Sequence, residues 1–152
     1  MSEEDRPVTR LTRGSRLFAA ATVGLGVVSG LHAIGHFTGS PRAAGIEAAM
    51  RATPVDLGLW LRPSMWDVYA TVSLAVPISL LGLALTNLTV LALAAPVPGL
   101  IRRLTLLDLV IVGAMVALHA SYGVLPPVFT LGAVELLFFA SLLLQRADEA
   151  ER

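Results

Sequence analysis

Long uncharged apolar stretches alternate along this chain with short segments that carry nearly all of its charges. No charged side chain lies between residues 16 and 42 or between residues 67 and 102. Uncharged apolar runs of about 18 or more residues are typical of transmembrane helices. Strands of a membrane barrel would instead alternate over about 10 residues, and no such alternation is visible. The pattern therefore predicts four spans, at residues 17–38, 68–93, 104–125 and 128–144.

The loop between the first two predicted spans, residues 39–66, is much longer than the other connections. Ser40 is a suitable N-cap and Pro41 suits the first position of a helix, so we predict a short helix over residues 41–52. The fold predicted is therefore all-α: a four-transmembrane-helix bundle with a short amphipathic helix in the long outer loop.

The other two connections are short turns, one near residues 95–99 and one at Pro126-Pro127. Within the second span, Pro77 removes one backbone hydrogen bond and predicts a kink. We expect residues 1–152 to form a single integral membrane domain with tails at residues 1–16 and 145–152.

Arginine placement predicts the orientation of the spans, because cytoplasmic loops carry an excess of basic residues. Three arginines fall in the predicted outer loop: Arg42, Arg51 and Arg62. Eight fall on the other side: Arg6, Arg10, Arg13, Arg16, Arg102, Arg103, Arg146 and Arg152. Both termini are therefore expected in the cytoplasm.

Composition supports a membrane protein and excludes several other classes. The chain is 55% hydrophobic and 14% charged, whereas soluble domains average about 25% charged residues. Its net charge is zero, so no basic face for nucleic acid is expected, and the partner predicted is the lipid bilayer. It has no cysteine for thiol–disulfide chemistry or metal ligation, and all eleven basic residues are arginine, which excludes a lysine Schiff base.

Ionisable side chains inside or beside the predicted spans are candidates for function, because charge in hydrocarbon is costly. There are six: His32, His36, Asp67, Asp108, His119 and Glu135. Helical rise places most of them in the outer half of the membrane, where they could converge. Asp108 lies near the predicted cytoplasmic end of its span, five residues after Arg103, and fits an ordinary interfacial acid.

Three interpretations of this outer cluster remain open. It could be a structural polar network, since interhelical hydrogen bonds help to fix helix register. It could be a transition-metal site or, with haem, a redox site, because His32 and His36 share one helix face. The predicted metal ligands are His32, His36, His119 and Glu135, with Asp67, Tyr69, Tyr122 and Trp66 around them. It could also be a proton or ion relay.

Three short segments resemble a family of small bacterial four-span membrane proteins that has no established activity. They are Gly-Leu-His-Ala-Ile-Gly-His at residues 30–36, Met-Arg at residues 50–51 and Ser-Met-Trp-Asp-Val-Tyr at residues 64–69. The family combines a GxxHxxGH-like first span, an MR pair in the outer loop and a WDxY-like entry to the second span. A weaker resemblance, carried by residues 30–32 and Phe37, is to DoxX-like four-span proteins and concerns the fold alone.

The resemblance implies a bacterial inner-membrane protein and supplies no substrate. It directs attention to Asp67, which we expect to accept a hydrogen bond from His36 where the second span begins. Trp66 and Tyr69 are expected to anchor that point at the membrane interface.

The function expected from the sequence is that of a multi-pass membrane protein of unknown activity with an outward His/carboxylate cluster. A metal- or haem-binding redox protein and a small proton- or ion-coupled transporter are the alternatives. No catalytic residue is assigned, a non-enzymatic role is favoured, and no cofactor is the default expectation. Because four helices enclose little volume, a homo-oligomer is expected.

Overall fold

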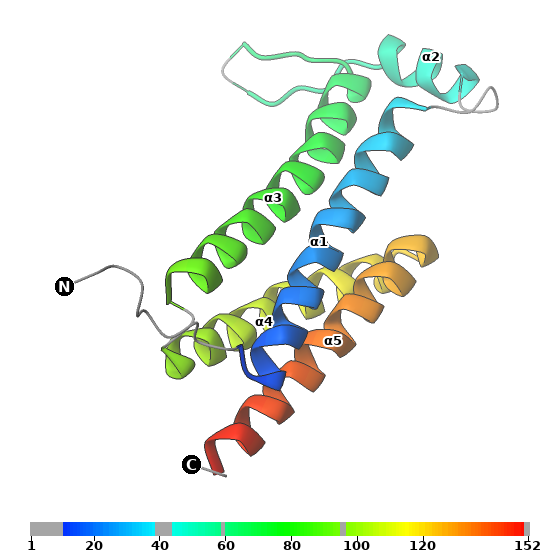
Figure 1. Cartoon of the computed structure of the whole chain (residues 1–152). Helices are drawn as coiled ribbons and strands as arrows, with labels where there is room; N and C mark the ends of the chain where they lie inside the picture. The colour runs from blue at the N-terminus through cyan, green and yellow to red at the C-terminus, as the bar shows by residue number, and fades with distance from the viewer. Residues whose placement is uncertain (1–10, 39–43, 59, 95–96, 151–152) are drawn as a thin grey trace. The chain divides into compact units, whose positions relative to one another are not determined.

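A computed structural model describes residues 11–38, 44–58, 60–94 and 97–150 (Figure 1). These residues form five α-helices: α1 (Arg13–Phe37), α2 (Ala44–Ala52), α3 (Met65–Ala94), α4 (Pro98–Ser121) and α5 (Leu125–Ala150). Within the described ranges the only β pairing is an isolated bridge between Pro54 and Ser64. The predicted all-α fold, with a short helix in the long loop, is confirmed.

Four of these helices are long and apolar enough to cross a membrane. The qualifying segments are Arg13–Phe37, Met65–Leu93, Gly99–Ser121 and Leu125–Asp148. Each contains at least 23 residues, whereas about 20 suffice for a core of about 30 Å. The chain therefore has the build of a multi-pass membrane protein.

The predicted and observed helix ends differ around residues 123–127, where glycine and proline constrain the backbone. The turn at Pro126-Pro127 was placed too late, because α5 already begins at Leu125 and both prolines lie in its first turn. Proline is tolerated there because first-turn N–H groups have no helical partner. The chain turns instead at Gly123, whose φ of 69° is accessible to a residue without a Cβ. The predicted cap Ser40 and the proline Pro41 lie outside the described residues.

Contacts divide the chain into two compact units. The first, which we call the four-helix unit, is Met1–Leu25 with Leu83–Arg152, and it combines the start of α1, the end of α3, α4 and α5. The second, the loop unit, is Gly26–Gly82 and contains the end of α1, α2 and the start of α3.

The core of the four-helix unit is built from one face of each helix. Phe18 of α1 and Phe138 of α5 are both fully buried, and their ring centroids lie 5.8 Å apart. The other large buried apolar side chains of this unit are Leu25, Leu91, Ile101, Val112, Leu131, Val134 and Leu142. Packing of these faces makes this unit a helical bundle.

A glycine sets the closest approach within that bundle. A Cβ built on Gly14 of α1 would lie 2.5 Å from Cγ and 2.8 Å from the backbone N of Gln145 on α5. In contrast, a Cβ built on Gly26 or Gly30 of the same helix has no atom within 4 Å.

We expect Gly14→Ala to destabilise the protein by about 2 kcal/mol, because the added methyl group collides with the α5 backbone. Gly26→Ala in the same helix is the matched control. It meets open space and should be neutral or stabilising by up to about 1 kcal/mol. Thermal unfolding of both variants in detergent measures the difference, and equal transition temperatures would contradict the close approach of α1 and α5.

Candidate functional site

Asp108 is the most deeply enclosed ionisable side chain of the four-helix unit. Its exposed fraction is 0%, and its Oδ2 accepts a 2.7 Å hydrogen bond from Nδ2 of Asn87 on α3. Asn87 is also 0% exposed. An acid on α4 and an amide on α3 therefore meet inside the packed helices.

A second set of polar groups lies one turn away along α4. Thr105 precedes Asp108 by three residues, so the two share a face of the helix. Nε2 of Gln145 on α5 donates to the hydroxyl oxygens of Thr105 at 3.0 Å and Ser141 at 2.8 Å. The Ser141 hydroxyl in turn donates to the carbonyl oxygen of Gly14 on α1 at 2.8 Å. We call Asn87, Thr105, Asp108, Ser141 and Gln145 the buried polar network, and it links all four helices.

The network carries more oxygen lone pairs than the protein can satisfy. Oδ1 of Asp108, Oδ1 of Asn87 and Oε1 of Gln145 are buried and have no hydrogen-bond partner in the protein. Leaving such an atom unpaired in an apolar surrounding costs several kcal/mol. A carboxyl group resolves this by holding a proton, and a set of oxygen ligands resolves it by binding a small hard cation or water.

Asp108, which fits an interfacial acid by its place in the sequence, is enclosed by the packed helices in the structure. The helix begins at Pro98, six residues before the predicted start of the span at residue 104. Asp108 therefore lies ten residues into α4, about 15 Å along its axis at 1.5 Å per residue.

The face of α4 that carries Asp108 is buried at one end and open at the other. Val112 follows Asp108 on this face and is 0% exposed, whereas Tyr122 beyond the helix end is 77% exposed. His119 is half-buried, and its Nδ1–H donates to the carbonyl oxygen of Met115 at 2.7 Å. The hydrogen bond ties His119 to its own helix and leaves Nε2 as the ring nitrogen that could accept a proton or bind a ligand.

Glu135 approaches a different face of α4. Its Oε1 lies 3.1 Å from the Cβ position of Gly113, so the missing side chain makes room for the carboxyl group. Gly113 is about 140° around the helix from Asp108 at 100° per residue, whereas His119 is only about 20° away. The Oε2 atom of Glu135 is buried and has no hydrogen-bond partner in the protein. Glu135 is therefore a second isolated acid of this unit.

The predicted metal ligands are divided between the two units. His32 and His36 belong to the loop unit, and His119 and Glu135 belong to the four-helix unit. Among the residues that the structure describes, no group of three or more His, Asp or Glu side chains could hold a metal ion. The four-residue metal site stays a prediction.

Four residues from the segments 30–36, 50–51 and 64–69 form a continuous row in the loop unit. The guanidinium carbon of Arg51 lies 5.0 Å from the centroid of the Trp66 ring. The Trp66 and Tyr69 centroids are 5.5 Å apart, and those of Tyr69 and His36 are 6.4 Å apart. His36 Nδ1 lies 3.0 Å from the Ser73 hydroxyl oxygen, within hydrogen-bond distance. We call Arg51, Trp66, Tyr69 and His36 the aromatic row.

Asp67 caps α3, so the predicted hydrogen bond between His36 and Asp67 is wrong. Oδ2 of Asp67 accepts hydrogen bonds from the backbone N of Ser64 at 3.0 Å and from its hydroxyl at 2.6 Å. The Ser64 hydroxyl oxygen lies 3.2 Å from the backbone N of Asp67, which donates to it. This reciprocal pairing is a capping box, which satisfies free N–H groups at a helix start. The Asp67 carboxylate, which we expected to bind His36 on another helix, therefore bonds locally to Ser64.

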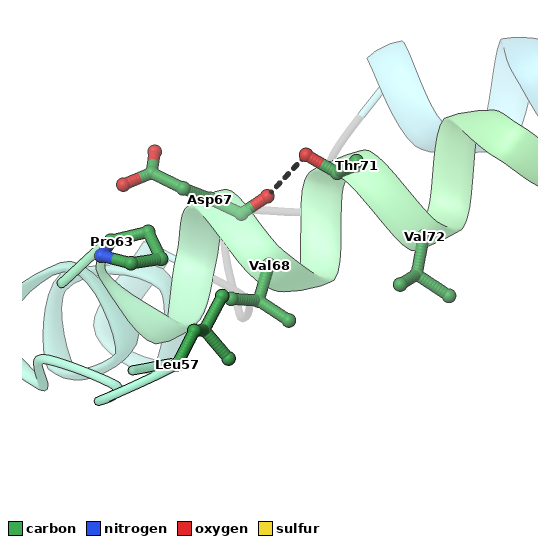
Figure 2. A pocket seen from close by; sticks show the side chains of 6 residues that line it. All are labelled: Leu57, Pro63, Asp67, Val68, Thr71 and Val72. Carbon is green, nitrogen blue, oxygen red and sulfur yellow. Dashed lines mark hydrogen bonds between the residues drawn. The ribbon is translucent and has the colours of Figure 1, made fainter. Parts of the chain in front are cut away.

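A small hollow lies beside the first turns of α3 (Figure 2). Its volume is about 210 Å³, and it is lined by Leu57, Pro63, Asp67, Val68, Thr71 and Val72. The Thr71 hydroxyl donates to the Asp67 carbonyl oxygen at 2.8 Å (Figure 2). The hollow is thus mainly apolar, with few free polar groups for a polar ligand.

Comparison with known proteins finds no matching family model, no matching curated protein and no matching solved structure. The functional interpretation therefore depends on the residues and their geometry.

Most of the buried polar network was missed from the sequence. Ser141 and Gln145 are four residues apart and could have been recognised as one polar face, but Gln145 was placed in the tail. Asn87 lies within the second predicted span, at residues 68–93, and was not recognised as a candidate. The signal available was an amide near the middle of an otherwise apolar span.

We expect Ser141→Ala to lower the free energy of unfolding by about 1 kcal/mol, because two hydrogen bonds within the bundle are lost. Ser121→Ala is the control. The Ser121 hydroxyl is exposed and bonds only to the Leu118 carbonyl oxygen of its own helix, so a change within about 0.5 kcal/mol is expected. Unfolding in mixed micelles measures both, and an unchanged Ser141→Ala variant would contradict the network.

Proposed function

We propose that this chain is a small multi-pass carrier of a bacterial inner membrane in which Asp108 takes up and releases a proton or a small cation. The observation that carries the proposal is the Asp108 carboxyl group. It is 0% exposed, one of its oxygens is paired with Asn87, and the other has no partner in the protein.

A purely structural network would be expected to satisfy all of its buried members. In this network Asn87, Asp108 and Gln145 each retain an unpaired buried oxygen. A permanently ionised carboxylate there would be strongly unfavourable. A carboxyl group that exchanges a proton or a cation resolves this cost and supplies a reversible binding step.

The depth of Asp108 also favours a carrier. Intramembrane acids that face the interior of a bundle mark ion pathways and proton relays. Coupling-ion sites of many transporters lie near the middle of the bilayer. Asp108 faces the interior of the bundle within an apolar segment long enough to cross the membrane, about 8 Å along the helix beyond Arg103.

The proposed orientation comes from the arginines. Eight of the eleven lie on the side of the termini and the α3–α4 connection, and three lie in the loop between α1 and α3. By the positive-inside rule the termini are then cytoplasmic. The resemblance of residues 30–69 to small bacterial membrane proteins supports a bacterial inner membrane.

The proposed carrier works as a homo-oligomer. Many large apolar side chains on the spans are exposed, among them Val110 at 71%, Phe129 at 71% and Leu136 at 69%. Lipid covers such side chains in a membrane protein, and contacts between copies could cover some of them. Four helices alone enclose little volume for a cargo.

We expect proteoliposomes that contain the protein to dissipate an imposed pH gradient or sodium gradient faster than protein-free vesicles. Asp108→Asn should reduce this rate to that of protein-free vesicles, because an amide can neither exchange a proton nor neutralise a cation. An internal pH-sensitive dye and a sodium-sensitive dye measure the two gradients separately and identify the coupling ion.

The control is Asp56→Asn, the same chemical change at a side chain that is 65% exposed in the loop unit. It should keep the wild-type rate. Asn at position 108 can still accept the hydrogen bond from Asn87, so the variant is expected to fold. A folded Asp108→Asn variant with wild-type flux would contradict the proposal.

A further inference from the structure

The segment that joins α2 to α3 is a hairpin held by backbone hydrogen bonds. The N–H of Met65 donates to the Thr53 carbonyl oxygen at 2.8 Å. The N–H of Val55 donates to the Pro63 carbonyl oxygen at 2.9 Å. Nearer the tip, the N–H of Leu57 donates to the Leu61 carbonyl oxygen at 3.2 Å. This ladder gives the loop a defined shape.

The hairpin tip presents apolar side chains outward. Trp60 is 91% exposed, Leu57 is 56% exposed and Leu61 is 53% exposed. We call these three residues the apolar tip. Exposed aromatic and aliphatic side chains grouped on one structured loop mark an interaction surface.

The backbone holds the tip in an uncommon conformation. Trp60 has a φ of 60°, in the left-handed region that bulky residues rarely adopt. Asp56 braces the turn, since its Oδ1 accepts a hydrogen bond from the N–H of Gly58 at 2.9 Å. Its other oxygen lies 3.5 Å from Nη2 of Arg62. Strain that a structure maintains in this way is typical of functional positions.

The hairpin lies along the start of a spanning helix. Leu57 and Pro63 of the hairpin line the hollow together with Val68 and Val72 of α3 (Figure 2). Val72 is seven residues into the candidate span Met65–Leu93, or about 10 Å along its axis. The apolar tip is therefore continuous with the part of α3 that enters the membrane, where Val72 is 61% exposed.

We propose that the apolar tip inserts into the boundary between lipid headgroups and acyl chains, and that the hollow takes a segment of acyl chain. The inference depends on α3 crossing the membrane and is independent of the role of Asp108. Lipid is favoured as the occupant because the tip continues the apolar surface of a spanning helix and because Trp prefers the membrane interface.

The polar parts of the hairpin agree with insertion at this shallow depth. Irregular backbone is excluded from the hydrocarbon core because its N–H and C=O groups lack partners there. Here the ladder satisfies several of those groups. Asp56 and Arg62 form a pair of opposite charges beside the tip, so at the headgroup level they add no net charge.

Tryptophan fluorescence tests the inference directly, because the chain has two tryptophans, Trp60 and Trp66. Trp66→Phe leaves Trp60 as the only tryptophan, and Trp60→Phe is the matched control that leaves Trp66. Each variant is reconstituted into phosphatidylcholine vesicles whose acyl chains carry bromine either near the headgroup or near the methyl end.

We expect Trp60 to emit at shorter wavelength than tryptophan in water and to be quenched more by shallow bromine than by deep bromine. It should be protected from aqueous iodide. If Trp66→Phe does not fold, the difference between wild type and Trp60→Phe gives the same quantity.

Three results would overturn the inference. The first is that aqueous iodide quenches Trp60 emission, whereas bromine at either depth leaves it unchanged. The second is shielding of Trp60 that increases with the protein-to-lipid ratio and is insensitive to bromine, which would assign the tip to a second copy of the chain. The third is failure of the protein to co-sediment with the vesicles, which would contradict the membrane assignment as well. If no Asp108-dependent flux is observed, the proposed function is contradicted and this inference is unaffected.

Discussion

Enclosure of the Asp108 carboxyl group is the constraint on which the packing of the four-helix unit depends. A carboxyl group within a membrane span must face protein, and here it faces the amide of Asn87 at 2.7 Å. Thr105, Ser141 and Gln145 extend this polar contact to α5 and the start of α1. The close approach at Gly14 lets the backbones of α1 and α5 lie near enough for these bonds to form. Hydrogen bonds that help to fix helix register thus lie on the same face of α4 as the group proposed to exchange an ion.

The loop unit follows a different principle, in which short-range pairing and aromatic contacts fix an irregular segment. Ser64 and Asp67 define the start of α3 by a capping box. Backbone hydrogen bonds shape the hairpin before it, and Trp66 and Tyr69 at the start of α3 connect Arg51 of α2 with His36 of α1. This arrangement makes residues from three separate sequence segments neighbours in space.

The extent to which the sequence predicted this structure depended on the kind of signal. The length of the uncharged apolar runs predicted the four long helices, because a membrane span must be apolar over about 20 residues. The helix that contains Asp108 begins at Pro98, six residues before the predicted start of its span at residue 104, because Arg102 and Arg103 were assigned to the turn. The network with Asn87 could not be foreseen, since hydropathy does not give the rotation of a helix about its axis. Asp67 was assigned to His36 because a local capping partner, Ser64, was overlooked.

Infrared difference spectroscopy of the reconstituted protein shows whether Asp108 exchanges a proton or a cation, because the carbonyl stretch of a protonated carboxyl group differs from that of a carboxylate. We expect a protonated-carboxyl band that disappears when pH is raised or when the coupling cation is added, and that is absent from Asp108→Asn. Identical difference spectra for wild type and Asp108→Asn would show that Asp108 exchanges neither a proton nor a cation. That result would contradict the account and leave the buried polar network with a structural role alone.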